Sequence, residues 1–417
     1  MSNKALKIIL VTTTLIIVIA GTFSGGFLAG NVYQKALNEG TNNPLLESIV
    51  SSTPVPQATN SGTPTDLREL FKPFWETWDV VHNEFVKQPV DDTLLMRGAI
   101  QGMLDSLGDK HTSYIDPDML RQANIQLTGE YDGIGAWVDV TTEYLTIISP
   151  MPNSPAEKAG LKPEDQVIAI NGEDMTGIDG NVVLKKILGP AGSKVTLSIL
   201  RKDITEPFDV LITREKIVVP SVVGKMVENN IAYIQISTFG ENTKQELETS
   251  IEELLTNNPK GLILDLRYNG GGLVDSAVDV ASQFIKEEVV MYEQFGDGTL
   301  NTKYANKNGL ARDIPLVVLV NEGTASASEI VAGAIQDYGR AKIVGVKSYG
   351  KGSEQTWRTL EDDQGAIRVT VAAWLTPLKR QINEVGLTPD FIVELTEEDI
   401  KNGKDPQLQK AIDLLSQ

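Results

Sequence analysis

The stretch LVVLVNEGTASASEIVAGAIQD, residues 316–337, places an apolar run, a polar turn and a helix-like segment in direct succession. The apolar run has no polar alternation, which is typical of a strand buried on both faces of a parallel sheet. In the turn, Thr324, Ser326 and Ser328 lie two residues apart among small residues. The stretch therefore predicts an α/β sheet, and it raises the question of whether one of these hydroxyls is a nucleophile.

The same alternation of strands and helices extends through the C-terminal half of the chain. We expect strands at 231–236, 262–266, 316–320 and 343–346, and helices at 241–255, 274–284 and 328–337. In such sheets, ligands bind beyond the carboxyl ends of the strands. Three polar loops are expected at that edge: 267–272, 323–328 and 347–355.

The helix after the second loop is expected to begin near Ser326. A helix N-terminus leaves main-chain N–H groups unpaired and carries the positive end of the helix dipole. An oxyanion formed there would be stabilised by about 3 kcal/mol for each well-placed donor. Serine and threonine are also favoured helix caps. The residues alone therefore leave capping and nucleophilic catalysis open.

A base for such a serine is not supplied by a nearby histidine. His82 and His111 are the two histidines of the chain, and both are remote in sequence from the sheet. Lys351 lies between two glycines, so its backbone can approach another segment closely. A lysine serves as a base where burial lowers its pKa from about 10.4 towards 7. The alternative is an exposed lysine in a glycine-rich loop.

Other sites for hydrolytic chemistry have less support. The chain has no G-x-S-x-G elbow, no H-E-x-x-H motif and no cysteine, so we expect no metal and no cofactor. Ser348 and Lys351 form an S-x-x-K spacing like that of penicillin-binding enzymes, but the S-D-N and K-T-G motifs are missing. A penicillin-binding hydrolase with Ser348 as nucleophile remains a weaker alternative.

The regions before the sheet differ in composition. Residues 66–128 contain apolar positions at helical spacing, with helices expected near 67–85 and at 92–106, either packed on the body or forming a dimerisation arm. Residues 129–217 predict a compact domain with strands at 145–148, 166–170 and 195–200 and helices at 154–159 and 181–188.

The N-terminus has the pattern of a membrane segment. Lys4 and Lys7 precede an apolar run from Ile8 to Ala20, and small and apolar residues continue to Gly30. This length suffices for a single-pass anchor with the body outside the cytoplasm. A signal peptide cleaved after the residues 18–20 is the alternative.

Composition and charge complete the domain organisation. Residues 41–65 are rich in Thr, Ser, Asn and Pro, which is typical of a disordered linker. The expected domains are 1–30, anchor or signal; 31–65, linker; 66–128, helical region; 129–217, β-rich domain; and 218–417, α/β core. The formal net charge of -19 argues against a nucleic-acid partner.

The motifs around the three loops resemble those of the carboxyl-terminal processing peptidases, also called tail-specific proteases. Their N-x-G-S-A-S-A-S-E-I, Q-D-x-G-R and F-G-K-G-x-x-Q segments match 321–330, 336–340 and 349–355. This resemblance implies a Ser–Lys serine endopeptidase. Its implied residues are Ser326 as nucleophile, Lys351 as general base and Gln355 as the orienting residue, with oxyanion donors from Gly271 or Gly272 and from Ala327.

The resemblance also covers the preceding domains. The run ISPMPNSPAEKAGLKPEDQVIAINGED, residues 148–174, resembles a PDZ domain. The implied fold is multi-domain α/β and α+β: an N-terminal helical region, a PDZ-like β-rich domain and a crotonase-like, spiral α/β protease core. The loop expected to bind a substrate's terminal carboxylate consists of Tyr131, Asp132, Gly133, Ile134 and Gly135.

By the same resemblance, the PDZ domain captures unfolded or C-terminally exposed protein and peptide tails and gates access to the protease site. A catalytically silent PDZ scaffold at the membrane is the alternative, and intact residues at 326, 351 and 355 argue against it. A homodimer is possible through the helical arm.

The chain departs from the family pattern at several positions. In the segments quoted above, Thr324 replaces a serine and Tyr349 replaces a phenylalanine. The segment 266–272 matches the family's L-R-N-N-P-G-G, with Tyr268 in place of an asparagine and Gly270 in place of the proline. The usual T-P-x-G-R segment reads TPLKR at 376–380, so a lysine replaces the glycine. None of these changes removes a catalytic atom, but the last is expected to affect how a loop packs.

Overall fold

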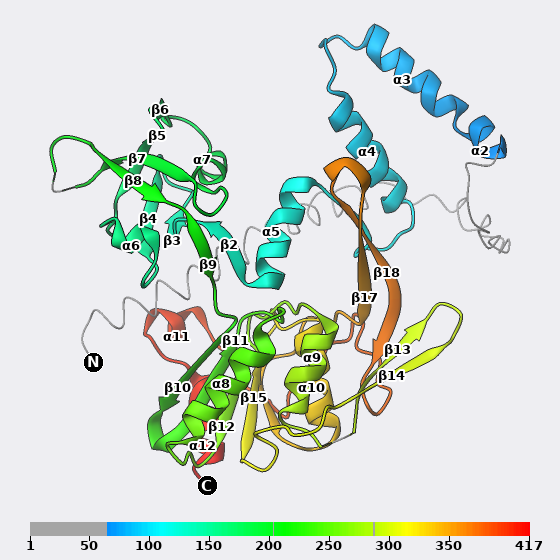
Figure 1. Cartoon of the computed structure of the whole chain (residues 1–417). Helices are drawn as coiled ribbons and strands as arrows, with labels where there is room; N and C mark the ends of the chain where they lie inside the picture. The colour runs from blue at the N-terminus through cyan, green and yellow to red at the C-terminus, as the bar shows by residue number, and fades with distance from the viewer. Residues whose placement is uncertain (1–64, 203, 287) are drawn as a thin grey trace. The chain divides into compact units, whose positions relative to one another are not determined.

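The computed structural model describes residues 65–202, 204–286 and 288–417 (Figure 1). The predicted membrane segment at 1–30 and nearly all of the predicted linker lie outside these residues. The chain divides into two compact units, the first ending at Tyr114 and the second spanning Ile115–Gln417. Among the described helices, none combines the length and the apolar composition needed to cross a bilayer.

The first unit is helical, as predicted. Its elements are α2 (Thr65–Leu70), α3 (Lys72–Glu84) and α4 (Asp92–Asp105). The expected helix near 67–85 is interrupted, because Pro73 near the start of α3 has no N–H and its ring opposes a continuous helix through this point. The carboxylate of Asp91 caps α4 by accepting from the N–H groups of Thr93 and Leu94.

The β-rich part of the second unit is a sheet in the order β3-β4-β5-β7-β8, with β6 beside β5. Alternate residues of β7 are buried, so one face of this sheet packs on its own core. The predicted strands and helices of this region are all present. The bounds are β3 (Ala136–Asp139), β4 (Leu145–Pro150), α6 (Pro155–Lys158), β5 (Gln166–Ile170), β6 (Glu173–Asp174), α7 (Gly180–Ile187), β7 (Lys194–Leu200) and β8 (Phe208–Thr213).

Shorter elements flank this domain. A two-stranded antiparallel ribbon pairs β2 with β9. The bounds are β1 (Ser113–Ile115), α5 (Pro117–Thr128), β2 (Glu130–Gly133) and β9 (Glu215–Val218). The helix α5 ends at Gly129, whose φ of 68° forms a left-handed cap.

The predicted parallel sheet is confirmed and has the order β10-β11-β12-β15-β16-β19. Only the β10–β11 pair is antiparallel. The bounds are β10 (Val222–Val227), η1 (Glu228–Asn230), β11 (Ile231–Ile236), α8 (Thr243–Leu255), β12 (Leu262–Asp265), α9 (Val274–Ser282), β15 (Leu316–Val320), α10 (Ala327–Asp337), β16 (Lys342–Gly345), β19 (Phe391–Ile392), α11 (Glu397–Lys401) and α12 (Pro406–Leu415).

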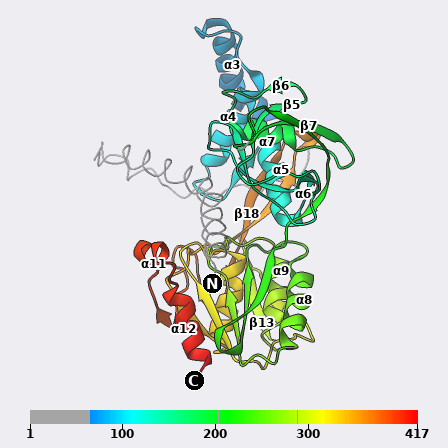
Figure 2. The same ribbon diagram turned by 90° about the vertical axis from the view of Figure 1, so that its left-hand side faces the viewer.

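Helices cover both faces of this sheet. Leu316, Val318 and Val320 of β15 pack in one core cluster with α8, α9 and α10. Val317 and Leu319 point the other way, into a cluster with α12. Figure 2 shows α12 in red on the face opposite α8 and α9. Each fully buried aliphatic side chain contributes about 1.5–3 kcal/mol, which explains why these strands have no polar alternation.

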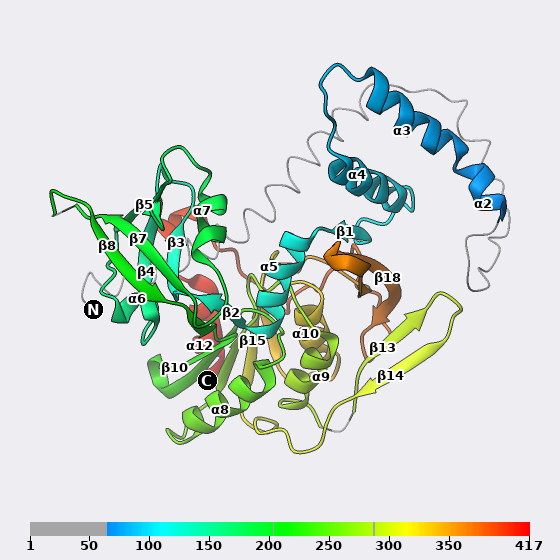
Figure 3. The same ribbon diagram turned by 45° about the horizontal axis from the view of Figure 1, so that its top comes forward.

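The core also contains a second sheet, which the sequence analysis did not predict. It is antiparallel, with β18 pairing both β13 and β17, and β14 pairing β13 (Figure 1 and Figure 3). The bounds are β13 (Val289–Phe295), β14 (Leu300–Tyr304), β17 (Ser353–Thr359), η2 (Glu361–Asp363) and β18 (Ala366–Leu375). Residues 353–355 therefore belong to a strand, whereas the sequence analysis placed them in a loop.

Candidate active site

The three predicted loops meet at the carboxyl edge of the parallel sheet. The N–H of Ala325 in the second loop donates to the carbonyl of Asn269 in the first loop at 3.0 Å. The N–H of Tyr349 in the third loop donates to the carbonyl of Thr324 in the second loop, also at 3.0 Å. Main-chain hydrogen bonds thus bring together segments that are distant in sequence.

The three hydroxyls of the second loop have different surroundings. Thr324 is fully buried, and its Oγ1 donates to the carbonyl of Leu266 at 2.8 Å and accepts from the N–H of Asn321 at 2.9 Å. Ser328 is also fully buried, and its Oγ donates to the carbonyl of Asn269 at 2.9 Å. Ser326 is partly exposed. Two of the hydroxyls therefore fasten loops together, and the middle one faces outward.

Ser326 lies at the N-terminus of α10, as the sequence analysis predicted. Its backbone has φ 54° and ψ −115°, a region that residues with a Cβ rarely adopt. Such a conformation costs about 1–3 kcal/mol and persists where the surroundings enforce it, often at active sites. Here the Ser326 N–H donates to Glu329 Oε2 at 2.8 Å, which holds the turn in place.

The first loop approaches the same serine closely. A Cβ on Gly271, whose φ is 105°, would lie 2.9 Å from the Ser326 Cβ and 3.0 Å from the Ala327 nitrogen. Only glycine allows this approach. The N–H of Gly271 donates to the Asn269 Oδ1 at 2.9 Å. Of the predicted donors, Gly271 and Ala327 are therefore adjacent to the serine, whereas Gly272 packs against the Phe239 backbone. A donor role for Gly271 requires that its bond to Asn269 opens.

The main chain of Lys351 is held at both of its polar groups. Its N–H donates to Glu329 Oε2 at 2.9 Å, and its carbonyl accepts from the Trp374 indole at 2.9 Å. The expected close approach of the flanking glycines is confirmed, since a Cβ on Gly352 would lie 2.4 Å from the Asn383 nitrogen. The lysine therefore projects from a fixed backbone.

Glu329 is a residue that the sequence analysis did not single out. Its side chain is fully buried, and its carboxylate accepts four hydrogen bonds. Oε2 accepts from the N–H groups of Ser326 and Lys351, and Oε1 accepts from the Ser348 hydroxyl at 2.6 Å and the Gly350 N–H at 2.7 Å. One carboxylate thus connects the serine loop with the lysine loop.

The electrostatics of Glu329 reflect two opposing effects. Burial raises the pKa of the carboxyl above its ordinary value, while the hydrogen bonds from Ser348 and from the main chain lower it, with a net rise. A charged residue among the small and apolar residues of a predicted buried helix was the sequence signal that could have revealed this role.

Gln355 lies in β17, with its amide fixed by two hydroxyls. Its Nε2 donates to Ser353 Oγ at 2.8 Å and to Thr370 Oγ1 at 3.1 Å. These bonds set the orientation of the amide, because its nitrogen must point towards the two hydroxyls, one of which belongs to Thr370 of β18.

Ser348, the nucleophile of the penicillin-binding alternative, is buried. Its Oγ donates to Glu329 and accepts from the Leu387 N–H at 2.7 Å. It lies in the loop between β16 and β17 rather than on a helix. Both hydrogen-bonding roles of the hydroxyl are structural, so this alternative loses its support.

In the β-rich domain, β3 is an edge strand of the sheet. Of the five residues predicted to bind a carboxylate, Tyr131, Asp132 and Gly133 lie in β2, whereas Ile134 and Gly135 directly precede β3. An edge strand offers unpaired main-chain groups to which an extended peptide can add. The arrangement is suited to peptide capture at this edge.

Two departures from the family pattern have visible consequences. Lys379, in place of glycine, has φ 59°, and Tyr268, in place of asparagine, has φ 60°. Glycine and asparagine tolerate this left-handed region better than the residues present. The left-handed conformation therefore costs about 1–2 kcal/mol at each of these two positions.

The comparisons with known proteins agree with this architecture. The model of peptidase family S41 matches residues 230–393, and that of the PDZ domain matches residues 146–201. The N-terminal domain of the activating protease CtpB matches residues 28–119. A putative S41 protease from Bacteroides fragilis has a similar fold, with a TM-score of 0.51 at 17% identity, covering 81% of this chain and 96% of that chain.

Two relatives show the similarity at the sequence level. The carboxyl-terminal-processing protease of Synechocystis sp. is 36% identical over 350 residues, which are 82% of each chain. The carboxy-terminal processing protease CtpA of Bacillus subtilis is 38% identical over 309 residues, covering 74% of this chain and 66% of the relative. With these similarities and the matching domains, the chain belongs to the carboxyl-terminal processing peptidases of family S41.

Proposed function

We propose that the peptidase acts through Ser326 and Lys351. The neutral amine of Lys351 takes the proton of Ser326 as its Oγ attacks the scissile carbonyl. The resulting ammonium then protonates the leaving amine, and water hydrolyses the acyl-enzyme with the same lysine as base. One observation carries this proposal: Thr324 and Ser328 are buried and hydrogen-bonded to main-chain carbonyls, whereas Ser326 is partly exposed. Ser326 also lies beside Gly271 of the first loop.

The main chain supplies the electrostatic stabilisation in this proposal. The N–H of Ala327 at the start of α10 and the N–H of Gly271 or Gly272 stabilise the oxyanion. Gln355 orients the lysine. Because the base must be neutral, kcat/KM is expected to rise towards neutral and alkaline pH.

The substrate is a protein with an exposed or unfolded C-terminal tail. The edge strand β3 supports capture of such a tail by β-strand addition, with the terminal carboxylate held by the segment 131–135, which runs from β2 to the start of β3. The PDZ domain then gates access to Ser326. The relatives are named for carboxyl-terminal processing, which agrees with this substrate class.

The remaining parts of the proposal concern location and assembly. The apolar run at 8–20 after Lys4 and Lys7 supports a single-pass anchor in a bacterial-type membrane, with the peptidase outside the cytoplasm. The helix α3 has no buried residue, and Phe71 and Trp75 are exposed, which supports a homodimer through the helical region.

Cleavage of an unfolded protein with an apolar C-terminal tail tests the proposed chemistry. The parent chain is compared with Ser326→Ala and with Ser106→Ala, which makes the same change at an exposed serine that directly follows α4. We expect Ser326→Ala to reduce kcat/KM by at least about 10³-fold and Ser106→Ala to leave it unchanged. Equal cleavage by the parent and by Ser326→Ala would show that another residue is the nucleophile.

A further inference from the structure

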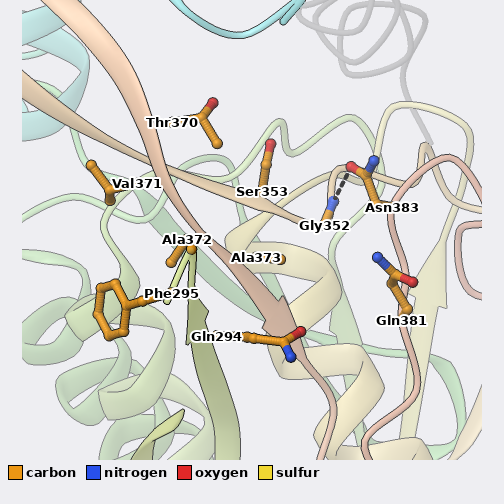
Figure 4. A pocket seen from close by; sticks show the side chains of 11 residues that line it. Gln294, Phe295, Gly352, Ser353, Thr370, Val371, Ala372, Ala373, Gln381 and Asn383 are labelled. Atoms are coloured by element: carbon orange, nitrogen blue, oxygen red, sulfur yellow. Dashed lines mark hydrogen bonds between the residues drawn. The ribbon is translucent and has the colours of Figure 1, made fainter. Parts of the chain in front are cut away.

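A groove of about 410 Å³ opens beside the loop that carries Lys351 (Figure 4). Its walls come from the end of β13, the start of β17, the end of β18 and the segment at 381–383. This volume lies in the range of about 300–1,000 Å³ that is usual for ligand sites. The groove belongs to the second sheet, which the sequence did not predict.

The groove is polar but uncharged. None of the described residues that line it carries a formal charge. The amides of Gln294 and Gln381 extend into it from two sides, while Phe295 and Val371 form an apolar part of the wall (Figure 4). Amides both donate and accept hydrogen bonds, as a peptide group requires of its partner.

The absence of a counter-charge determines which ligand fits. A charged side chain in this groove would lose water without gaining an ion pair, which is unfavourable. An uncharged side chain has a much smaller desolvation cost. Small residues, among them Ala373, leave room for such a side chain.

The groove shares residues with the proposed catalytic site. Gly352 lines it and directly follows Lys351. Ser353 and Thr370, which hold the Gln355 amide, line it as well. A ligand in the groove therefore contacts the residue next to the proposed base and the hydroxyls that hold the Gln355 amide.

We propose that this groove binds an uncharged side chain of the extended substrate polypeptide, next to the scissile bond. The inference rests on the proposed peptidase function of Ser326 and Lys351, and it adds the determinant of cleavage-site specificity. The PDZ edge strand and the groove then recognise different parts of one substrate: the tail and the cleavage site.

Charge substitutions at Val371 test this inference, because the side chain is 38% exposed and tolerates a polar replacement. The full chain and its Val371→Lys and Val371→Glu variants are given a peptide series with Ala, Glu or Lys at each position flanking the cleaved bond. Cleavage sites are mapped by mass spectrometry. Val223→Lys and Val223→Glu on β10 serve as matched controls.

We expect the parent to disfavour both Glu and Lys at one position by about tenfold relative to Ala. Val371→Lys should raise the relative kcat/KM of the Glu peptide about fivefold, and Val371→Glu should do the same for the Lys peptide. Unchanged preferences in both variants, with thermal unfolding like that of the parent, would overturn the groove assignment. Failure of the proposed function is distinct, because cleavage would then be absent in the parent or persist in Ser326→Ala.

Discussion

The two sheets of the peptidase core differ in what they contribute to the site. The parallel sheet ends in the loops with Gly271, Ser326 and Lys351, whereas β17 of the antiparallel sheet begins where the Lys351 loop ends and carries Gln355. The central strands of the parallel sheet, β12 and β15, are buried along their whole length. The strands of the second expose polar side chains, some of which line the groove.

This difference indicates that the parallel sheet positions the proposed nucleophile and base, whereas the antiparallel sheet adds the residue proposed to orient the base. Ser326 and Lys351 lie in the loops that follow β15 and β16 of the same sheet. Glu329, at the start of α10, accepts from both loops and so forms the junction between them. A carboxylate with four acceptor positions can do this because each oxygen serves two donors.

The largest effect is expected from removing the proposed base in the loop after β16. Lys351→Ala should reduce kcat/KM by at least about 10³-fold, because no other group in the proposal takes the serine proton. Lys347→Ala, an exposed lysine of the same loop, is the control and should retain activity. Substantial activity of Lys351→Ala in steady-state cleavage assays would refute the Ser–Lys mechanism.

Breaking the junction should have the next largest effect. In Glu329→Gln, an amide nitrogen would face two hydrogen-bond donors, so one side of the junction loses its bonds. We expect about 10- to 100-fold lower kcat and a loss of about 2–4 kcal/mol in the free energy of unfolding. Kinetics and urea unfolding measure the two effects.

Glu322→Gln, an exposed carboxylate in the serine loop, is the matched control for this change. If Glu329→Gln lowers stability but leaves kcat unchanged well below its melting temperature, then the carboxylate supports the fold and does not position the catalytic residues.

Gln355→Ala tests the fixed amide of β17. Because the amide is proposed to orient the lysine rather than to react, we expect about a tenfold fall in kcat with little change in KM. Gln245→Ala, the same change at an exposed glutamine of α8, is the control and should leave kcat unchanged. A change in KM alone would place Gln355 in substrate binding instead.

The smallest effect concerns Glu354, also on β17. Burial, together with the charge of Glu293, raises the pKa of Glu354 to about 6, while Lys303 opposes the rise. Its Oε2 is buried and has no hydrogen-bond partner among the described residues. Because the pKa in the folded state is raised, stability is lost as the pH rises from about 4.5 to about 6.

Glu354→Gln cannot ionise, so it should be more stable than the parent above pH 6. After allowance for partial solvent exposure, the gain is about 1 kcal/mol, or about 2 °C in Tm. Thermal unfolding between pH 4 and pH 7.5 measures it, and the difference should shrink below pH 4.5. A constant difference across this range would rule out the titration of Glu354 as its cause.

The sequence by itself determined the parallel sheet and the loops at its edge. Apolar strands such as 316–320 can be recognised from the sequence, because burial on both faces excludes polar residues. The site of Ser326 also followed from local pattern, since a strand that turns directly into a helix places its turn at the sheet edge. The family motifs then assigned roles to Ser326, Lys351 and Gln355, and these roles remain predictions.

Only the tertiary structure decided which hydroxyl faces outward and how the loops are joined. Thr324 and Ser328 look equivalent to Ser326 in the sequence, and the carbonyls to which they donate lie more than 50 positions away. The second sheet was missed for a similar reason: β13 and β18 pair across a long separation in sequence, so their pairing follows only from the folded chain. Glu329 acquires its role only when segments distant in sequence pack around its carboxylate, because hydrogen bonds of this kind depend on proximity in space.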